Sequence, residues 1–221
     1  MNNHSLSKTW VIISLLAALG MSLGAVNPVL AQDGDREPLA KNESEKRILS
    51  VLDDISEGPV VEEMHGRLLR ILAESTKAKN VVEIGTGKGV SALWLCLGLR
   101  ATGGKLVTHE IDPEQVVLAR ANFKRAGVEN LVTVVEGDAR RTVSQLKEPI
   151  DLLFIDAEGG NLEYLNRLLP LVRPGGLILV DNMSKPKPCP PFIKAITTNP
   201  NLESIFLNMQ STGISLMVKK I

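Results

Sequence analysis

Residues 80–91 contain the feature that most constrains this chain, a short β-branched run that passes directly into closely spaced glycines. The run occupies residues 81–84, and an apolar stretch of helical length follows at 92–99. The glycines are Gly85, Gly87 and Gly89. Strand, glycine turn and helix in this order form a binding crevice at the carboxyl end of the first strand of an α/β sheet. Glycine lets the backbone approach a ligand closely, and the helix start offers unpaired N–H groups.

Three classes of ligand compete for such a turn. A P-loop with Lys88 as its lysine needs a glycine where Val82 stands and a hydroxyl where Gly89 stands, so this alternative fails. A dinucleotide fingerprint is weakened because Val90 occupies its third glycine position. The third pattern is E-x-G-x-G-x-G, with Glu83 just before the turn. A carboxylate there suits a ligand that carries an ammonium group and repels a pyrophosphate. A glycine turn without any ligand is the remaining alternative.

Composition sets the size and the broad class of the protein. A chain of 221 residues is long enough for one well-buried domain. Lys and Arg number 25 and so do Asp and Glu, which leaves no net charge and gives no indication of nucleic-acid binding. Cys96 and Cys189 have no metal-binding spacing. Aromatic residues make up 3% of the chain, which bears on the acceptor discussed below.

The first 31 residues have the pattern of a targeting segment. Lys8 precedes an apolar run at 10–19, and small residues then lead to a cleavage pattern that ends at Ala31. We expect a secretory signal cut after Ala31, which would make the protein secreted or periplasmic. An uncleaved membrane anchor formed by residues 10–31 is the alternative. Residues 32–41 are polar and form a linker to the domain at 42–221.

Alternating strand and helix patterns predict an α/β fold for residues 42–221. Asn42 followed by Glu45 starts a helix that ends at Gly58-Pro59, and a second helix carries Val61, Met64, Leu68, Ile71 and Leu72. These two helices would cover a sheet face or contact a second copy in a homodimer. The later pattern predicts a doubly wound, mainly parallel, seven-stranded sheet. Its expected strands are 81–84, 105–111, 131–135, 150–155, 177–180, 202–207 and 214–219, with helices at 92–99, 113–123, 162–172 and 192–198 and a turn at 173–176.

Polar side chains stand at the end of most predicted strands. In a parallel sheet those ends open on one edge, where ligands bind. The residues are Glu83, Glu110, Asp138, Asp156, Asp181 and Asn182. Glu110 ends the second strand and is placed to accept the two hydroxyls of a ribose. A single acid at such a place is more often a helix cap, but six together indicate a site.

Asp156, Asp181 and Asn182 form the sharpest part of this pattern. The strands that precede them are expected to be neighbours, so two carboxylates and an amide oxygen would converge. Hard oxygen ligands in that number suit Mg²⁺ or Ca²⁺. Zinc is disfavoured, because residues 32–221 contain only two histidines, His65 and His109. The alternative is that Asp181 and Asn182 only hydrogen-bond a turn.

The order of these motifs resembles the cation-dependent O-methyltransferases of the catechol and caffeoyl-coenzyme A type. The likeness covers about residues 60–220 and includes a helix with Met64 and Gly66 that is similar to the family's cofactor-covering segment. The motifs that carry it are Glu83-Ile-Gly-Thr-Gly-Lys-Gly-Val-Ser91, His109-Glu-Ile-Asp-Pro113, Gly137-Asp-Ala139, Phe154-Ile-Asp-Ala157 and Arg173-Pro-Gly-Gly-Leu-Ile-Leu-Val-Asp-Asn182.

The resemblance implies an enzyme that transfers a methyl group from S-adenosylmethionine (SAM) to a hydroxyl of a small acceptor with the help of a divalent cation, expected to be Mg²⁺. The methionine end of SAM would contact Glu83, Gly85 and Ser91, its ribose Glu110, and its adenine Asp138 and Ala139. The metal ligands would be Asp156, Asp181 and Asn182. Further cofactor contacts are implied for Val61, Gly87 and Asp156.

Two departures from the family pattern concern the catalytic step. The family usually carries a lysine as base three residues after the first metal aspartate, and Gly159 stands there. Lys185 and Lys187 are candidates to replace it, so the base is not identified. The segment 183–191 is rich in proline and lysine and lacks the family's tryptophan and glycines. With 3% aromatics, this makes a flat aromatic acceptor less certain than the cofactor.

The targeting segment leaves a second function open. A translocated protein would work where SAM is not expected, so the alternative is a secreted, non-catalytic protein that retains the fold. A NAD-type oxidoreductase is disfavoured by Val90 and Glu83.

Overall fold

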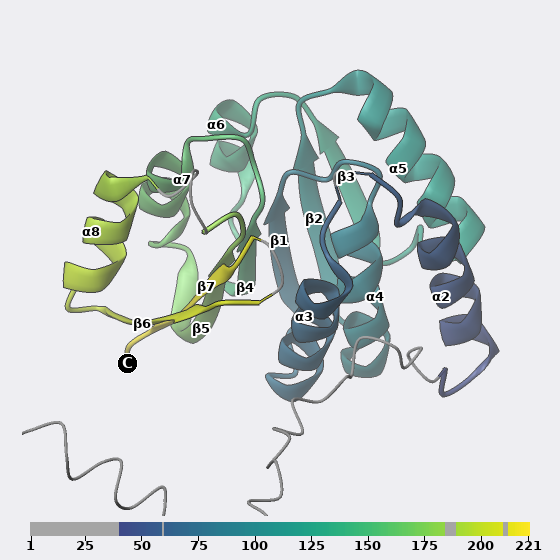
Figure 1. Cartoon of the computed structure of the whole chain (residues 1–221), viewed down its shortest axis with the longest axis horizontal. Coiled ribbons are helices and arrows are strands. Elements are labelled where there is room, and N and C mark those ends of the chain that lie inside the picture. The colour runs from purple at the N-terminus through teal and green to yellow at the C-terminus, as the bar shows by residue number, and fades with distance from the viewer. Residues whose placement is uncertain (1–39, 59, 184–188, 210–211) are drawn as a thin grey trace, which may run out of the picture. The chain divides into compact units, whose positions relative to one another are not determined.

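A computed structural model describes residues 40–58, 60–183, 189–209 and 212–221. Its centre is a seven-stranded sheet with the order β3-β2-β1-β4-β5-β7-β6 (Figure 1). The strands are β1 Asn80–Ile84, β2 Lys105–Glu110, β3 Val132–Glu136, β4 Ile150–Ile155, β5 Val172–Val180, β6 Leu202–Leu207 and β7 Ile214–Lys219. The helices are α2 Glu43–Ile55, α3 Glu63–Ser75, α4 Val90–Thr102, α5 Pro113–Ala126, α6 Ala139–Thr142, η2 Val143–Gln145, α7 Asn161–Leu168 and α8 Pro190–Thr198.

The sheet is mainly parallel, as the alternating pattern predicts. β1 pairs in parallel with β2 and β4, β2 with β3, and β4 with β5. The last two strands run the other way, because β7 is antiparallel to both β5 and β6. The predicted doubly wound fold with seven strands is therefore confirmed.

Helices cover both faces of the sheet and produce two hydrophobic cores. One core joins α2, α3, α4 and α5 to the sheet, and the other joins α6, α7 and α8 to its opposite face (Figure 1). Helix α4 is buried from Val90 to Leu99 because it lies between the sheet and α3. Gly66 permits this packing, since a Cβ there would come within 2.2 Å of the Trp94 ring. Burial of this extent is the main source of stability for such a fold.

The two predicted N-terminal helices are present and pack against α4 and α5 on one side of the sheet. Asn42 caps α2 by accepting the Glu45 N–H at 3.0 Å, while the Glu45 carboxylate reaches back to the Lys41 N–H at 3.1 Å. This arrangement resembles a capping box, except that the Glu45 carboxylate binds the N–H of Lys41 and not that of the cap residue Asn42. Arg70 of α3 also binds Glu45 at 2.9 Å, so the start of α2 is tied to α3. A homodimer contact through these helices stays a prediction.

The predicted turn at 173–176 is wrong. These residues belong to β5, which begins at Val172 opposite Ile150 and resumes pairing at Leu177 opposite Leu152. The proline and two glycines are accommodated as an irregularity within the strand, because extra residues on one strand can bulge without ending the ladder. Helix α7 is also shorter than predicted, ending at Leu168, and the sequence did not predict the one-turn helix α6.

The topological switch point of the sheet lies at the carboxyl end of β1. From β1 the chain moves outward through β2 and β3, then returns to form β4 on the other side of β1. Ligands bind at such a switch point because the connections on its two sides diverge. Within the described ranges, no helix combines the length and apolar character needed to cross a bilayer. The predicted signal and linker, residues 1–31 and 32–41, lie outside those ranges, apart from residues 40 and 41.

Asp151 joins the amino-terminal ends of three neighbouring parallel strands, at the end of the sheet opposite the site. Its Oδ2 accepts the N–H groups of Lys79 and Asn80 at 2.7 and 2.8 Å, and its Oδ1 accepts Arg173 Nε at 2.5 Å. One carboxylate therefore ties the starts of β1, β4 and β5 together. Although burial opposes it, these hydrogen bonds hold the pKa of Asp151 below its ordinary value.

We expect Asp151→Asn to lower the free energy of unfolding by about 1–3 kcal/mol, because an amide presents a donor to groups that are themselves donors. Urea unfolding followed by circular dichroism measures this. Asp54→Asn, at an exposed ion pair with Arg125, is the control and should change stability by less than about 0.5 kcal/mol. Equal effects of the two substitutions would contradict the assigned role of Asp151.

Candidate active site

The glycine turn after β1 lies directly against the end of β4. Gly85 has φ +94°, and a Cβ on it would come within 2.1 Å of the Asp156 carbonyl oxygen. Only glycine fits this position, because both the backbone conformation and the available space exclude a side chain. The Asp156 N–H in turn binds the Ile84 carbonyl at 2.9 Å. The predicted cofactor turn and the predicted metal ligand therefore share one rigid junction.

Glu110 holds the glycine turn from the other side. Its Oε2 accepts the N–H groups of Thr86 and Gly87 at 3.0 and 2.8 Å, and its Oε1 accepts the Asp112 N–H at 2.9 Å. The carboxylate is buried at the end of β2. Oε2 already accepts two N–H groups, whereas Oε1 accepts one and keeps a second lone pair, which leaves room for one further hydrogen bond from a ribose hydroxyl. The sequence predicted the ribose role and did not predict that the same carboxylate shapes the turn.

Glu83 is completely buried beneath this turn. Thr108 donates its hydroxyl to Glu83 Oε2 at 2.5 Å, and Thr86 and Thr108 are joined through their hydroxyl oxygens at 2.5 Å. Because the Thr108 proton goes to Glu83, Thr86 is the donor between the two threonines. Glu83 Oε1 is buried and has no hydrogen-bond partner among the described residues.

Burial raises the pKa of the Glu83 carboxyl to about 8, although the hydroxyls of Ser91 and Thr108 act in the opposite direction. The negative charges of Asp156 and Glu110 raise it further. A buried carboxyl with one oxygen left without a partner is costly to ionise. An ammonium group brought to Oε1 would remove that cost, which is the chemistry predicted from the sequence.

Asp138 and Ala139 form the turn after β3 on the far side of the site. Asp138 is the N-cap of α6 and accepts the Arg140 N–H at 2.9 Å through Oδ1. Beneath this turn Thr142 bonds to the Asp138 carbonyl at 3.4 Å and to His109 Nδ1 at 2.7 Å. Burial lowers the pKa of His109 to about 4, so the ring is neutral. The buried His109 Nε2 has no partner among the described residues.

Two of the three predicted metal ligands meet. The Asn182 side-chain nitrogen lies 2.8 Å from Asp156 Oδ1, across the ends of β4 and β5. Asn182 has φ +62°, a left-handed conformation that is strained for a residue with a side chain. Rotating the amide by 180° about its last bond would present its oxygen at the same place. The pair thus has the donor atoms and the proximity that a hard cation requires.

The third predicted ligand, Asp181, is already engaged by other groups. Its Oδ1 accepts the Asn182 N–H at 2.6 Å and the Thr212 hydroxyl at 3.0 Å, and His65 Nδ1 lies 3.3 Å from the carboxylate. His65 Nε2 lies 3.2 Å from the Met209 carbonyl. Burial works against protonation of His65, but the hydrogen bond and charge of Asp181 outweigh it and raise the pKa of His65.

The predicted donor set has the chemistry that a divalent cation requires. Asp156 and Asn182 converge, and Asp181 precedes Asn182 in the chain at the same sheet edge. Among the described residues, however, no group of three or more His, Cys, Asp or Glu side chains is placed to hold a metal. A metal site here would therefore need the Asn182 amide as one of its ligands.

The remaining predicted residues have less direct places. Ser91 is buried in the first turn of α4, and Val61 is buried in the core just before α3. Gly159 has φ +74°, and a Cβ there would meet nothing within 4 Å, so the position of the family's lysine is open. Lys185 and Lys187 lie outside the described residues.

Four residues of the site were not predicted from the sequence. Thr86 and Thr108 connect to Glu83, and His65 contacts Asp181. Only strand register and helix packing bring these partners together. Ile111 directly follows Glu110, and its side chain is 64% exposed.

Comparison with known proteins gives consistent matches. A family model described as O-methyltransferase matches residues 47–185. A relative named catechol O-methyltransferase from Mycobacterium tuberculosis is 41% identical over 125 residues, 56% of this chain and 56% of that protein. A second relative of that name, from Niastella koreensis, is 39% identical over 123 residues, 53% of this chain and 55% of that protein. The chain thus spans about half the length of the curated relatives it matches.

The fold matches solved structures over a longer stretch. An O-methyltransferase from Bacillus cereus in complex with SAH is 29% identical with a TM-score of 0.70, covering 82% of this chain and 93% of that chain. Cofactor-bound Rv0187 from MTB is 30% identical with a TM-score of 0.70, and the match covers 81% of this chain and 90% of that chain.

We expect Glu83→Gln to stabilise the ligand-free protein increasingly from pH 5 to pH 8. The pKa of Glu83 is 4.5 ordinarily and about 8 in the fold, so between these values the folded state binds more protons than the unfolded chain. Wild-type stability therefore declines with rising pH, by on the order of 2 to 4 kcal/mol, and glutamine removes that decline. Urea unfolding of both proteins at pH 5 and pH 8 measures it. Parallel pH profiles would show that Glu83 ionises normally.

Proposed function

The chain belongs to the O-methyltransferase family, and from this membership we propose that it transfers a methyl group from SAM to a hydroxyl of a small acceptor. The observation that carries the proposal is the buried Glu83 carboxyl, whose Oε1 lacks a partner at the topological switch point. Relatives named catechol O-methyltransferase and a similar structure in complex with SAH support it.

In this proposal the chain binds SAM along the carboxyl ends of β1, β2 and β3. Glu83 accepts the ammonium group, and the backbone around Gly85 and Gly87 lies along the methionine part. Glu110 accepts a ribose hydroxyl through the remaining lone pair of Oε1. The adenine lies between the turn at Asp138–Ala139 and the exposed Ile111 side chain. Each group has a place that its chemistry suits: a charge for a charge, acceptors for hydroxyls and an apolar surface for a ring.

We further propose a divalent cation, Mg²⁺, held by Asp156, Asn182 and Asp181. Its positive charge would favour the ionised form of an acceptor hydroxyl. SAM supplies the methyl group: an oxygen–carbon bond forms as the carbon–sulfur bond breaks, and the hydroxyl proton leaves to a base. Lys185 and Lys187 are the candidates for that base. The chain itself contributes mainly by positioning the reactants. The names of the relatives favour a vicinal diol as acceptor.

Calorimetric titration of S-adenosylhomocysteine into the full chain tests the cofactor site. We expect a Kd in the micromolar range or tighter, and release of close to one proton near pH 7 as Glu83 ionises. The proton count follows from titrations in buffers of different ionisation enthalpy. Glu83→Gln should abolish proton release and weaken binding at least about tenfold. A folded wild-type chain that does not bind would overturn the proposal and favour a non-catalytic protein.

The metal proposal has a separate test. Asp156→Ala should lower turnover of a catechol by at least about 100-fold while circular dichroism stays unchanged, because the first metal ligand is lost. Removing divalent cations from the wild type with EDTA should have the same effect, and Mg²⁺ should reverse it. Activity that survives both treatments would exclude the cation from the reaction without affecting the cofactor assignment.

We also propose that residues 1–31 direct the domain across a membrane. The support is the sequence pattern alone, a charge before an apolar run and a small-residue cleavage pattern. Mass spectrometry of the protein from its own cells should give Gln32 as the first residue. An intact Met1 in a membrane fraction would indicate the anchor instead.

A further inference from the structure

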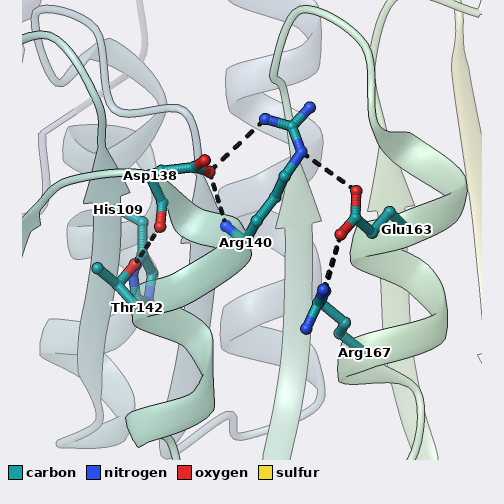
Figure 2. Close-up of polar contacts among 6 residues, drawn as sticks. All are labelled: His109, Asp138, Arg140, Thr142, Glu163 and Arg167. Atoms are coloured by element: carbon teal, nitrogen blue, oxygen red, sulfur yellow. Dashed lines mark hydrogen bonds and ion pairs between the residues drawn. The ribbon is translucent and has the colours of Figure 1, made fainter.

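One arginine connects the adenine side of the site to the loop that follows Asp156. Arg140 is the second residue of α6, directly after the predicted adenine-binding residues. Its backbone N–H donates to Asp138 Oδ1 at 2.9 Å, and its guanidinium lies 3.6 Å from the same oxygen (Figure 2). The Asp138 carboxylate is thus held twice by a single residue, which limits the directions in which its oxygens can point.

The same guanidinium reaches across to α7. Its Nε donates to Glu163 Oε2 at 3.1 Å, and its centre lies 5.7 Å from the centroid of the Tyr164 ring. Figure 2 shows the Arg140 side chain extending from α6 toward Glu163, with Arg167 on the far side of that carboxylate. A cation above an aromatic face and beside a carboxylate is held in a defined orientation.

Gly160 shows how closely this arginine packs on the loop. Gly160 ends the loop that begins at Asp156, and it has φ +79°. A Cβ at Gly160 would come within 3.2 Å of Arg140 Nη2 and 3.0 Å of the Tyr164 ring. Gly160, at the end of this loop, therefore lies close to the guanidinium, and glycine leaves the room that this approach needs.

We propose that Arg140 is a positioning residue that keeps the adenine turn and the Asp156 loop in fixed relation, so that the cofactor and acceptor sides of the site form together. This inference rests on the proposed function. Arg140 and Glu163 side chains are 42% and 41% exposed, and exposed ion pairs add little to stability. Arg140 therefore contributes to the affinity for the ligand and adds little to the free energy of unfolding.

Arg167 provides a matched control. It binds the same carboxylate, with Nη2 2.8 Å from Glu163 Oε1, and it is 47% exposed. Arg167 lies on the same helix as Glu163, however, and among the described residues its side-chain hydrogen bonds and ion pair go to Glu163. Removing it deletes an equivalent charge without cutting the connection between α6 and α7.

The test is calorimetric titration of S-adenosylhomocysteine and of adenosine into the full chain and its variants. For Arg140→Ala we expect both Kd values to rise about three- to tenfold, whereas Arg167→Ala leaves them within about twofold of wild type. Glu163→Gln should weaken binding more than Arg167→Ala, although Glu163 touches no predicted ligand contact. Melting temperatures of Arg140→Ala and Arg167→Ala should agree. Arg140→Lys keeps the charge and loses the planar contacts, so its Kd should lie between those of wild type and Arg140→Ala.

Steady-state kinetics then tests the acceptor side. If Arg140 also fixes the Asp156 loop, Arg140→Ala raises the KM of the acceptor as well as that of SAM. Because 0.5 M salt screens the exposed charges, it should reduce the difference in these KM values between Arg140→Ala and wild type. Equal binding by Arg140→Ala and Arg167→Ala would overturn the proposal. A different outcome would overturn the connection to the loop. In that outcome Arg140→Ala raises the Kd of adenosine, but Glu163→Gln leaves binding unchanged and the acceptor KM does not change. Binding by the wild type decides the proposed function separately.

Discussion

The hydrogen bonds from the glycine turn to Glu110 are the interaction on which the rest of the site depends. They fix residues 86 and 87 at the end of β2, while Gly85 lies in contact with the Asp156 carbonyl at the end of β4. The turn therefore spans the switch point between the two halves of the sheet. The Asp156 carbonyl is a backbone group and the Glu110 carboxylate is buried, so the turn between them has little freedom to move. The groups around the turn are therefore preorganised for a ligand.

The same turn encloses a destabilising feature. Glu83 is buried among threonine hydroxyls that satisfy only part of its carboxyl, and its pKa is about 8 as a result. A core position of this kind would be more stable with an apolar or amide side chain. Proteins retain such groups where binding requires them, because a ligand of opposite charge compensates the buried group at the moment of binding.

Several residues act in structure and in the site at once. Asp138 caps α6 and stands where the adenine is expected, and Glu110 binds the turn and stands where the ribose is expected. Asp181 holds Thr212 and faces His65 besides being a predicted metal ligand. The two interpretations of a strand-end acid, helix cap or ligand contact, are therefore not exclusive. A carboxylate has enough lone pairs for both.

The sequence by itself determined the order of strands and helices, the parallel sheet and the edge at which the acids gather. These follow from local patterns, since apolar periodicity and glycine spacing act over a few residues. Other features depend on contacts between residues far apart in the chain, and only the tertiary structure decided them. Thr108 meets Glu83 through the register of β1 and β2, His65 meets Asp181 through the packing of α3, and Arg140 meets Glu163 across two helices. The strand through 173–176 belongs to the same class, because β4 pairs with Val172 before this segment and with residues 177–180 after it. Register and side-chain rotamers set such contacts, and they are fixed only when the whole sheet and its helices pack together.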